Sequence, residues 1–597
     1  MALGEAAELR RDEARPRRRA PSAVEAWAAG LLSLDPASGR ADPGLVALLT
    51  PQRCVALQVL PWRRAGGAAL VLCPDPVAAR AHLNEIEAAL GPARLAHAEA
   101  EAFRLALNRD AGRPLALGAE RRVPGRWSCR TLAPGPLARA AVAGLVALLL
   151  ALVAAPLAVV AGLTALAVAG LLLTSALKLA AASATLRRDA RDGGAEVIPA
   201  RLPVISLLVP LYREDRIASR LLQRIEALDY PRDALDLCLI LEDDDEATRA
   251  ALAEAALPPW AQVIEVPEGT LRTKPRALNY ALGFAKGSVV GIYDAEDAPA
   301  PDHLRRVAAH FARRGPEVAC LQGALDFYNP RRNWIARCFT LEYAAWFRVM
   351  LPGLDRLGLV IPLGGTTLFL RREAIEAAGG WDAHNVTEDA DLGLRLARMG
   401  LRTEVIAIAT MEEANSRAWP WVRQRSRWLK GYAVTWAVHM RDPVALWRDL
   451  GTRRFCAVQV QFLCAVMGFA LAPLLWTFWL VPLGLPHPLA PLLPPALLVA
   501  LSILFLAAQV LDLACAWLGA RRSGRPDLAW WAPALNLYFV MATLAVWRAL
   551  WEVAACPFRW DKTTHGLDEP EEESGALPCP ATAPEVGPGA VLARSAL

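Results

Sequence analysis

The chain has 597 residues, of which 55% are hydrophobic and 21% are charged. This length predicts two to four domains, and the long apolar runs are typical of a membrane protein rather than a soluble enzyme. The formal net charge is only +5, and the arginines stand mostly beside apolar runs. This arrangement indicates a membrane face and argues against a nucleic-acid polymer as partner. The 11 cysteines form no C-x-x-C pair, so neither a disulfide framework nor a zinc site is indicated.

The first 130 residues are soluble in character. Residues 1–22 predict a basic disordered tail without a signal peptide, and residues 23–130 predict a small α+β domain. Within it we expect strands over 55–61 and 68–72 and an amphipathic helix over 77–90. This order of elements resembles the small N-terminal domain of type II secretion ATPases, which in some relatives binds cyclic di-GMP. The Arg-Leu-Gly type motif of that binding is missing, so a plain docking domain is favoured over nucleotide sensing.

Apolar runs flank the centre of the chain. The run 137–182 is long enough for two spans of roughly 20 residues, and arginines follow it at once. Residues 455–556 hold three further apolar segments. We expect the last of these to be re-entrant or interfacial, because three full spans would leave the C-terminal tail outside. Asp512 is the single deep charge in these runs, and we expect it to face a channel.

Residues 200–443 alternate short β-rich runs with segments of helix length. The β-rich runs cover residues 204–209, 235–241, 263–266 and 289–293. This alternation predicts a doubly wound α/β domain, whose ligands bind at the carboxyl ends of the strands. The polar motifs of the region follow those strand ends.

The first two strand ends carry an aromatic residue and several acids. Tyr212 and Glu214 follow the first strand. Residues 242–246 form an acidic run after the second strand, and crowded carboxylates cost free energy unless they are solvated or paired. Asp243 and Asp244 are the best candidates there for ligand contacts, and a solvated turn is the alternative.

Phosphate and metal contacts are expected from the next two motifs. Lys274 stands just before an expected helix, where a point charge and the helix N-terminus can meet a phosphate. Asn279, one turn later, is expected to reach the sugar or to organise the loop. Asp294 and Glu296 follow the fourth strand, and on an extended segment they would face the same side and ligate Mg²⁺ or Mn²⁺ through oxygen.

Two motifs further along the chain are the most distinctive. Thr-Glu-Asp ends at Asp389, and Gln-x-x-Arg-Trp covers residues 424–428. Together they resemble the signature of membrane-embedded, processive family 2 glycosyltransferases, the cellulose and hyaluronan synthase class. The resemblance implies a GT-A fold for residues 200–443, beside an α-helical transmembrane bundle in the bacterial inner membrane.

The resemblance also implies roles for these residues. Asp389 would take the proton of the acceptor hydroxyl, with Asp391 as the competing candidate. Arg427 would neutralise charge on the leaving diphosphate, Gln424 would help to hold it, and Trp428 would stack on the terminal sugar of the acceptor. On the donor side the family places uracil beside an aspartate such as Asp243 or Asp244, the nucleotide base and ribose beside Tyr212 and Glu214, and a metal on the diphosphate at Asp294 and Glu296. Residues 322–329 and 364–367 are similar to its acceptor-side and donor-sugar elements.

The C-terminal tail carries a further motif. Residues 557–567 resemble the gating loop of cellulose synthases, in a form closer to glycosyltransferases of the phage adsorption protein B type. Lys562, Thr563 and His565 would then contact the diphosphate. Residues 568–597 predict a disordered tail.

We therefore expect an inverting hexosyltransferase that uses UDP-glucose and Mg²⁺ or Mn²⁺ to elongate a β-linked polysaccharide and move it across the membrane. Its expected partners are the UDP-sugar, the growing polysaccharide, the lipid bilayer, and cyclic di-GMP or an export protein of the periplasm or outer membrane. Three alternatives remain open. They are transfer of one sugar to a lipid carrier, a secretion or receptor subunit on a transferase scaffold, and a transporter, which the lack of midmembrane charges disfavours most.

Overall fold

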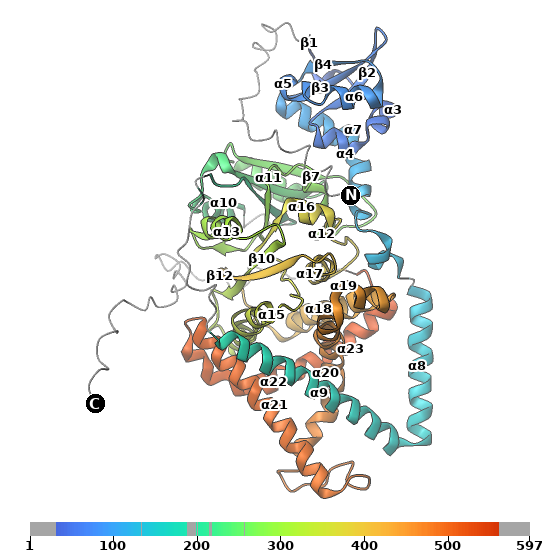
Figure 1. The fold of residues 1–597 in the computed structure, drawn as a ribbon, viewed down its shortest axis with the longest axis vertical. Helices are drawn as coiled ribbons and strands as arrows, with labels where there is room; N and C mark the ends of the chain where they lie inside the picture. The colour runs from blue at the N-terminus through green and yellow to red at the C-terminus, as the bar shows by residue number, and fades with distance from the viewer. Residues whose placement is uncertain are drawn as a thin grey trace, which may run out of the picture. The chain divides into compact units, whose positions relative to one another are not determined.

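The computed structural model of the chain describes residues 32–132, 134–187, 199, 201–213, 218–255 and 257–559. They divide into two compact units (Figure 1). The smaller holds the described residues up to Gly118 together with Glu265–Gly269, and the larger holds Ala119–Ile264 and the chain from Thr270 onward.

The smaller unit has a four-stranded sheet in the order β1-β4-β3-β2. Its elements are β1 (Leu32–Ser33), α3 (Pro43–Leu49), α4 (Pro51–Ala56), β2 (Leu60–Ala65), β3 (Ala68–Cys73), α5 (Pro76–Arg80), α6 (Leu83–Leu90), β4 (Ala93–His97) and α7 (Ala100–Glu120). The predicted strand over 68–72 is confirmed as the fully buried β3.

Two local predictions in this unit were wrong. A strand was expected over 55–61, but its first residues end helix α4, and the strand begins only at Leu60. The Thr50 hydroxyl accepts from Arg53 N at 3.4 Å, and Pro51 stands at the first helical position, a combination that favours a helix start. The helix expected over 77–90 is divided into α5 and α6.

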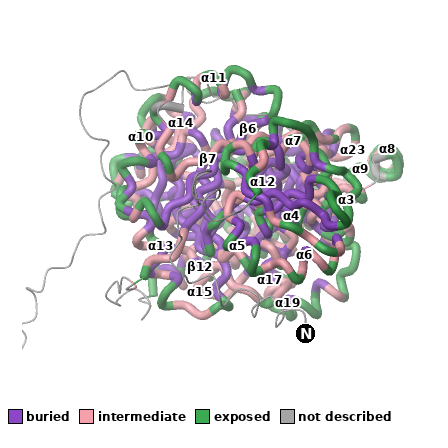
Figure 2. Tube along the Cα trace, turned by 90° about the horizontal axis from the view of Figure 1, so that it is seen from above, coloured by how far each residue is buried: buried purple, intermediate pink, exposed green. Residues whose placement is uncertain are grey.

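The larger unit is built on a mixed eight-stranded sheet in the order β7-β6-β5-β8-β11-β10-β12-β9. Its strands are β5 (Ile205–Leu211), β6 (Leu235–Glu242), β7 (Ala261–Val266), β8 (Val289–Ile292), β9 (Ala298–Pro299), β10 (Val318–Phe327), β11 (Leu368–Arg371) and β12 (Arg402–Glu412). The four predicted strands are confirmed as β5 to β8. β5 runs parallel to β6 and β8, whereas β11 runs antiparallel to β8 and β10. β6 is buried along its whole length, as expected for a strand covered on both faces (Figure 2).

Helices cover the sheet and lead to the apolar segments. They are α10 (Ala218–Glu226), α11 (Glu246–Glu254), α12 (Lys274–Ala281), α13 (His303–Ala312), α14 (Trp334–Ala345), α15 (Leu351–Arg356), α16 (Arg372–Ala377), α17 (Glu388–Arg398) and α18 (Ala418–His439). The apolar segments are α8 (Pro134–Ala154), α9 (Pro156–Leu186), α19 (Pro443–Val458), α20 (Ala465–Trp476), α21 (Pro495–Arg522), α22 (Leu535–Tyr538) and α23 (Val540–Ala555).

Three helices of the described chain are long and apolar enough to cross a membrane: Pro156–Leu186, Pro443–Trp479 and Pro495–Arg522. The apolar part of α8, Ala138–Ala154, is shorter than a full span of about 20 residues. The last segment is bent by 46° between Tyr538 and Val540, in agreement with the expectation that it is not a straight span.

Close backbone contacts pack two of the apolar helices, α9 and α21, against helices α15 and α14 of the larger unit. A Cβ on Gly353 of α15 would stand 2.2 Å from the carbonyl oxygen of Ala181 on α9. A Cβ on Gly519 of α21 would stand 2.5 Å from the carbonyl carbon of Ala344 on α14. Only glycine permits such approach, so the C-terminal ends of α9 and α21 pack directly against α15 and α14.

The apolar helices are also joined by a charge pair. Asp512 on α21 forms an ion pair with Lys178 on α9. Asp512 is therefore not a lone charge, since pairing is the usual way to reduce the cost of a charge among apolar helices. Its expected position facing a channel stays a prediction.

Candidate active site

The sheet brings the expected donor residues to neighbouring strand ends. Asp243 and Asp244 are exposed just after β6, and Asp244 pairs with Arg272 at 2.7 Å. Arg272 also hydrogen-bonds the Tyr212 side chain, which follows β5. Asp245, in contrast, is buried and accepts from Thr248 Oγ1 at 2.8 Å as the N-cap of α11. Of the three aspartates in this run, Asp243 and Asp244 are therefore the exposed ones.

Lys274 joins two of the expected donor elements. It is the first residue of α12, and its ammonium donates to the Asp294 carboxylate and, at 2.9 Å, to Gly365 O. Burial alone lowers the pKa of Lys274, but the negative charges of Asp294 and Glu388 outweigh it and raise that pKa above the ordinary value. Lys274 is thus a fixed positive charge at the strand end.

The Asp294 loop differs from the extended segment that we expected. Residues 294–297 form a turn in which Asp297 N donates to Asp294 O at 3.1 Å. Asp297 is 1% exposed, and its Oδ2 accepts from Asp294 N at 2.8 Å and from the Thr366 hydroxyl. The argument that Asp294 and Glu296 face one side because the backbone is extended was therefore wrong, since the backbone turns between them.

The chemistry of this loop nevertheless fits a divalent cation. Asp297 Oδ1 and Glu412 Oε1 are buried and lack a hydrogen-bond partner. Burial raises the pKa of Glu412 well above the usual range, and the charges of Asp297, Glu296 and Asp294 raise it further. Carboxylate oxygens crowded in this way are the donors that Mg²⁺ and Mn²⁺ prefer. No three acidic, histidine or cysteine side chains of the described chain are already arranged as a metal site.

Asp389 lies beside Lys274 at the start of α17. A Cβ built on Gly365 would stand 3.3 Å from Asp389 Oδ2 and 3.8 Å from Lys274 Nζ. Burial raises the pKa of Asp389 to about 6, although the Ala390 N–H, Lys274 and Arg427 counteract it. A carboxylate with this pKa can accept a proton near neutral pH.

Asp391, the competing candidate, has other partners. It is fully buried, and it accepts from Arg395 Nε at 2.7 Å and contacts His439 Nε2 at 2.9 Å. Burial alone raises the pKa of Asp391, but Arg395 and His439 lower it below the ordinary value. Asp391 is therefore held as a paired anion inside the fold, whereas Asp389 lies next to Lys274 and Gly365.

The Gln-x-x-Arg-Trp motif lies on α18. The Trp428 ring stacks on Phe339 with 6.3 Å between centroids and 12° between planes, and the Arg425 guanidinium lies 4.6 Å from the Trp428 ring centre. Arg427 is close enough to Asp389 for its charge to lower the pKa of that carboxyl. Gln424 Oε1 is buried without a hydrogen-bond partner. The motif thus places a cation near the candidate base and an aromatic ring nearby on the same helix.

Asn279 has a different environment from the one expected for a sugar contact. Its amide nitrogen donates to Ala119 O at 3.0 Å and to Trp381 O at 2.6 Å, and its oxygen accepts from Trp381 N at 2.9 Å. The residue is 3% exposed. Of the two expected roles, contacting the sugar or organising the loop, these bonds therefore favour the second for Asn279.

Four of the expected site residues lie outside the described chain: Glu214, Lys562, Thr563 and His565. The proposed gating loop and its resemblance to the phage adsorption protein B type therefore stay predictions.

Sequence reasoning missed Arg272 and Glu412. Arg272 belongs to a loop without a distinctive pattern. Glu412 ends β12, and a pair of acids closing a strand was the signal that would have marked it. Thr367, within a segment that was singled out, has φ of +53°, which is rare for a β-branched residue and is found most often at functional sites.

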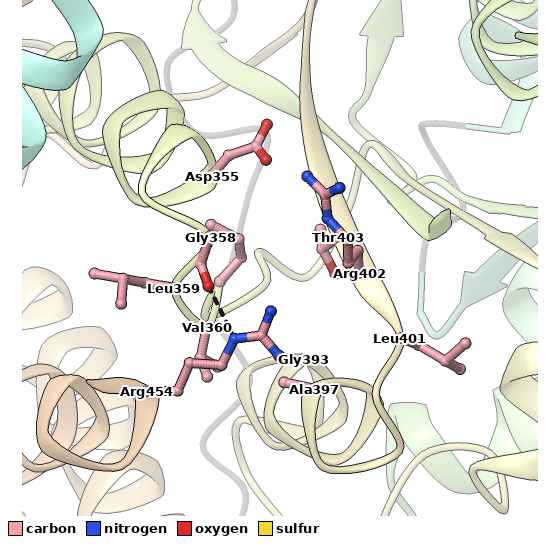
Figure 3. A pocket seen from close by; sticks show the side chains of 11 residues that line it. Asp355, Gly358, Leu359, Val360, Gly393, Ala397, Leu401, Arg402, Thr403 and Arg454 are labelled. Carbon is pink, nitrogen blue, oxygen red and sulfur yellow. Dashed lines mark hydrogen bonds between the residues drawn. The ribbon is translucent and has the colours of Figure 1, made fainter. Parts of the chain in front are cut away.

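A separate pocket lies at the other end of α17 (Figure 3). It is lined by Gly393 and Ala397 of that helix and by Arg454, which donates to Gly358 O at 2.9 Å. None of the expected site residues lines it.

Comparisons with known proteins find two domain matches in the chain. Residues 203–431 match the family described as glycosyltransferase like family 2, and residues 29–117 match the MshEN domain. The larger unit contains a family 2 glycosyltransferase domain. Together with the mixed sheet, this match gives the larger unit a GT-A-like α/β fold.

The chain is similar to several curated glycosyltransferases. It is 28% identical over 304 residues to beta-monoglucosyldiacylglycerol synthase of Synechocystis sp., covering 49% of this chain and 61% of that protein. It is 28% identical over 239 residues to cellulose synthase 1 of Komagataeibacter xylinus, covering 39% of this chain and 15% of that protein. The chain thus spans about three fifths or less of the length of these relatives. Among solved structures, it is 22% identical to a mannosyltransferase of Pyrobaculum calidifontis in complex with GDP-Man and Mn²⁺, with a TM-score of 0.41 and coverage of 64% of this chain and 98% of that one.

Proposed function

We propose that the chain is an inverting hexosyltransferase that transfers a sugar from a UDP-hexose, with UDP-glucose as first candidate, to an acceptor at a membrane face. The observation that carries this proposal is the position of Asp389 beside Lys274 and Gly365, with a pKa raised to about 6. A single displacement at an anomeric carbon needs a base for the acceptor proton and a cation for the leaving diphosphate. Asp389 and Lys274 supply these two groups next to Gly365.

In the proposed mechanism Asp389 accepts the proton of the acceptor hydroxyl. The acceptor oxygen forms a bond to the anomeric carbon while the bond from that carbon to the diphosphate oxygen breaks, and its electron pair leaves with UDP. Lys274 and Arg427 stabilise the negative charge that grows on the diphosphate. Asp244 and Arg272 hold the nucleotide end of the donor.

A divalent cation, Mg²⁺ or Mn²⁺, would neutralise diphosphate charge when bound. Asp294 and Glu296 would hold it, and the unpaired oxygens of Asp297 and Glu412 lie in the same cluster. In the structure Lys274 bonds Asp294, which holds that carboxylate in a defined position.

The first candidate acceptor is a growing β-linked polysaccharide, which would be exported across the bacterial inner membrane. The partly buried Trp428 ring, which packs on the buried Phe339, supports a sugar acceptor, because an aromatic face can stack on a sugar ring. The Arg521 and Arg522 end of α21 packs against the glycosyltransferase domain, which supports a multi-pass protein with that domain in the cytoplasm.

A lipid acceptor is the second candidate, and a specific observation favours it. Apolar side chains including Ala167, Leu475, Phe478 and Phe505 pack into one cluster between α9, α20 and α21. Packing of this kind fills the space that a polymer would need between these three helices. One relative, moreover, is named as a synthase of a glucosyl diacylglycerol.

One experiment separates the two acceptors. Inverted membrane vesicles are supplied with labelled UDP-glucose and Mg²⁺ or Mn²⁺, and the labelled product is divided into long insoluble material and lipid-soluble material. Insoluble polymer supports the polysaccharide synthase, and short lipid-soluble product supports the lipid acceptor. No transfer from any common UDP-sugar contradicts the proposed function.

The MshEN domain makes cyclic di-GMP a candidate ligand of the smaller unit, with an export protein as the alternative. Equilibrium binding of labelled cyclic di-GMP to the full-length protein tests the first, and no saturable binding would contradict it.

A further inference from the structure

Glu120 lies outside the family match of the glycosyltransferase domain, yet its carboxylate holds a loop of that domain. It is the last residue of α7 and is 3% exposed. Its Oε1 accepts from Thr270 N at 2.7 Å and from Leu271 N at 3.1 Å, and its Oε2 accepts from Thr270 Oγ1 at 2.5 Å. Hydrogen bonds to a charged acceptor are about twice as strong as neutral ones, so this carboxylate fixes the backbone at 270–271.

The loop that Glu120 holds leads directly to two of the three cations that we assign to the donor, Arg272 and Lys274. Arg272 follows Leu271 directly and pairs with Asp244 at 2.7 Å. Lys274, two residues further at the start of α12, bonds Asp294 and Gly365 O. A shift of the backbone at Thr270 would therefore move these two positive charges.

The residues that follow Glu120 form hydrogen bonds with the segment before Asp389 and with α12. Ser128 Oγ donates to Asp382 Oδ1 at 2.8 Å, and Cys129 N donates to Asp382 Oδ2 at 2.7 Å. Asp382 is fully buried and lies on the segment that leads to Asp389. Arg122 Nη1 also donates to Asn279 O at 3.3 Å. Residues 122–129 thus contact α12, which begins with Lys274, and the segment that leads to Asp389.

We propose that Glu120 is a positioning residue for the nucleotide donor. It holds residues 270–274 so that Arg272 and Lys274 meet the nucleotide and diphosphate. The inference rests on the proposed function in one respect, the assignment of Lys274 to the donor.

The test measures UDP affinity by titration calorimetry on the full-length protein in detergent, with thermal unfolding of each variant alongside. Glu120→Ala is expected to weaken UDP binding about tenfold, the equivalent of about 1.4 kcal/mol. Glu120→Gln keeps an oxygen for the two N–H groups and is expected to stay within about twofold of wild type. Glu101→Ala is the matched control, because Glu101 is an exposed acid on the same helix, with 59% of its side chain accessible.

Lys274→Ala is the reference for the donor site and is expected to weaken UDP binding strongly. If it does so and a folded Glu120→Ala binds UDP like wild type, Glu120 is only structural and the inference is overturned. If Lys274→Ala leaves UDP affinity unchanged, the proposed donor site fails first and the inference falls with it. Should Glu120→Ala not fold, Glu120→Asp takes its place, because its shorter side chain draws the carboxylate away from Thr270 N and Leu271 N. An unchanged UDP affinity in a folded Glu120→Asp overturns the inference as well.

Discussion

His439 Nε2 lies 2.9 Å from Asp391 Oδ1, and this contact joins α17, which begins with the Thr-Glu-Asp motif, to α18, which carries Gln-x-x-Arg-Trp. Arg395 binds the other oxygen of Asp391 at 2.7 Å. The relationship explains how two motifs far apart in the chain are held together, and it assigns Asp391 to the framework.

Asp391→Ala should therefore act on stability. It leaves the buried Arg395 charge without its partner, and breaking a buried pair typically costs about 3 kcal/mol or more. Thermal unfolding of the detergent-solubilised protein should show a clearly lower Tm. Asp389→Asn serves as the comparison and should keep at least the wild-type Tm, because it removes a carboxylate whose charged form burial disfavours. Equal Tm values for wild type and Asp391→Ala would contradict this assignment.

The transfer rate should rise with pH through about 6. The folded pKa of Asp389 is raised to about 6 from an ordinary value of 3.8, so the acid form, which cannot accept a proton, dominates below that pH. Initial rates at saturating donor, measured from pH 5 to 8, should increase roughly tenfold per pH unit on the acid side. A flat profile, or a rate that falls as the pH rises through 6, would rule out Asp389 in this role.

Gly365→Ala should slow transfer without weakening UDP binding. The added methyl group would stand 3.3 Å from Asp389 Oδ2, where it crowds the base and the incoming acceptor. We expect a fall in kcat of about tenfold or more, since small misplacements of reacting groups are costly. Gly364→Ala is the matched control, because its methyl group would meet Phe347 and Gln322 instead. The idea fails if both variants have the same kcat.

Trp428→Ala should raise the KM for the acceptor. Loss of the aromatic face removes a stacking contact of about 1 kcal/mol, which corresponds to about fivefold in affinity. Trp428→Phe keeps a ring that can stack on Phe339 and should recover most of the effect. Steady-state kinetics with the acceptor varied give the answer, and an acceptor KM that is unchanged in Trp428→Ala would remove Trp428 from the acceptor site.

Much of the larger unit could be predicted because its signals are local. The strands β5 to β8 are short apolar runs, and their polar ends lie where parallel strands place a ligand site. The order of Thr-Glu-Asp and Gln-x-x-Arg-Trp pointed to the glycosyltransferase domain without any knowledge of the fold. The donor cation Lys274 was predicted for the same reason, since a lysine before a helix is a local pattern.

The parts that were missed depend on residues distant in the chain. The ion pair of Asp512 with Lys178 joins segments that no local pattern connects. The same holds for the hydrogen bond that Thr270 N donates to Glu120. The turn at Asp294 was missed because alternation was assumed to continue past the strand, whereas the Asp297 N–H closes the backbone on Asp294 O. The start of helix α4 was missed because its cap, Thr50, lies five residues before the apolar run 55–61, and that run alone suits a strand.

The most direct test of the account compares wild type, Asp389→Asn and Asp391→Asn in inverted membrane vesicles supplied with labelled UDP-glucose and a divalent cation. We predict that Asp389→Asn binds UDP like wild type but loses transfer by a factor of about 10² to 10⁴, while Asp391→Asn keeps measurable transfer. Wild-type transfer by Asp389→Asn, together with an inactive but folded Asp391→Asn, would contradict the assignment of Asp389 as the base.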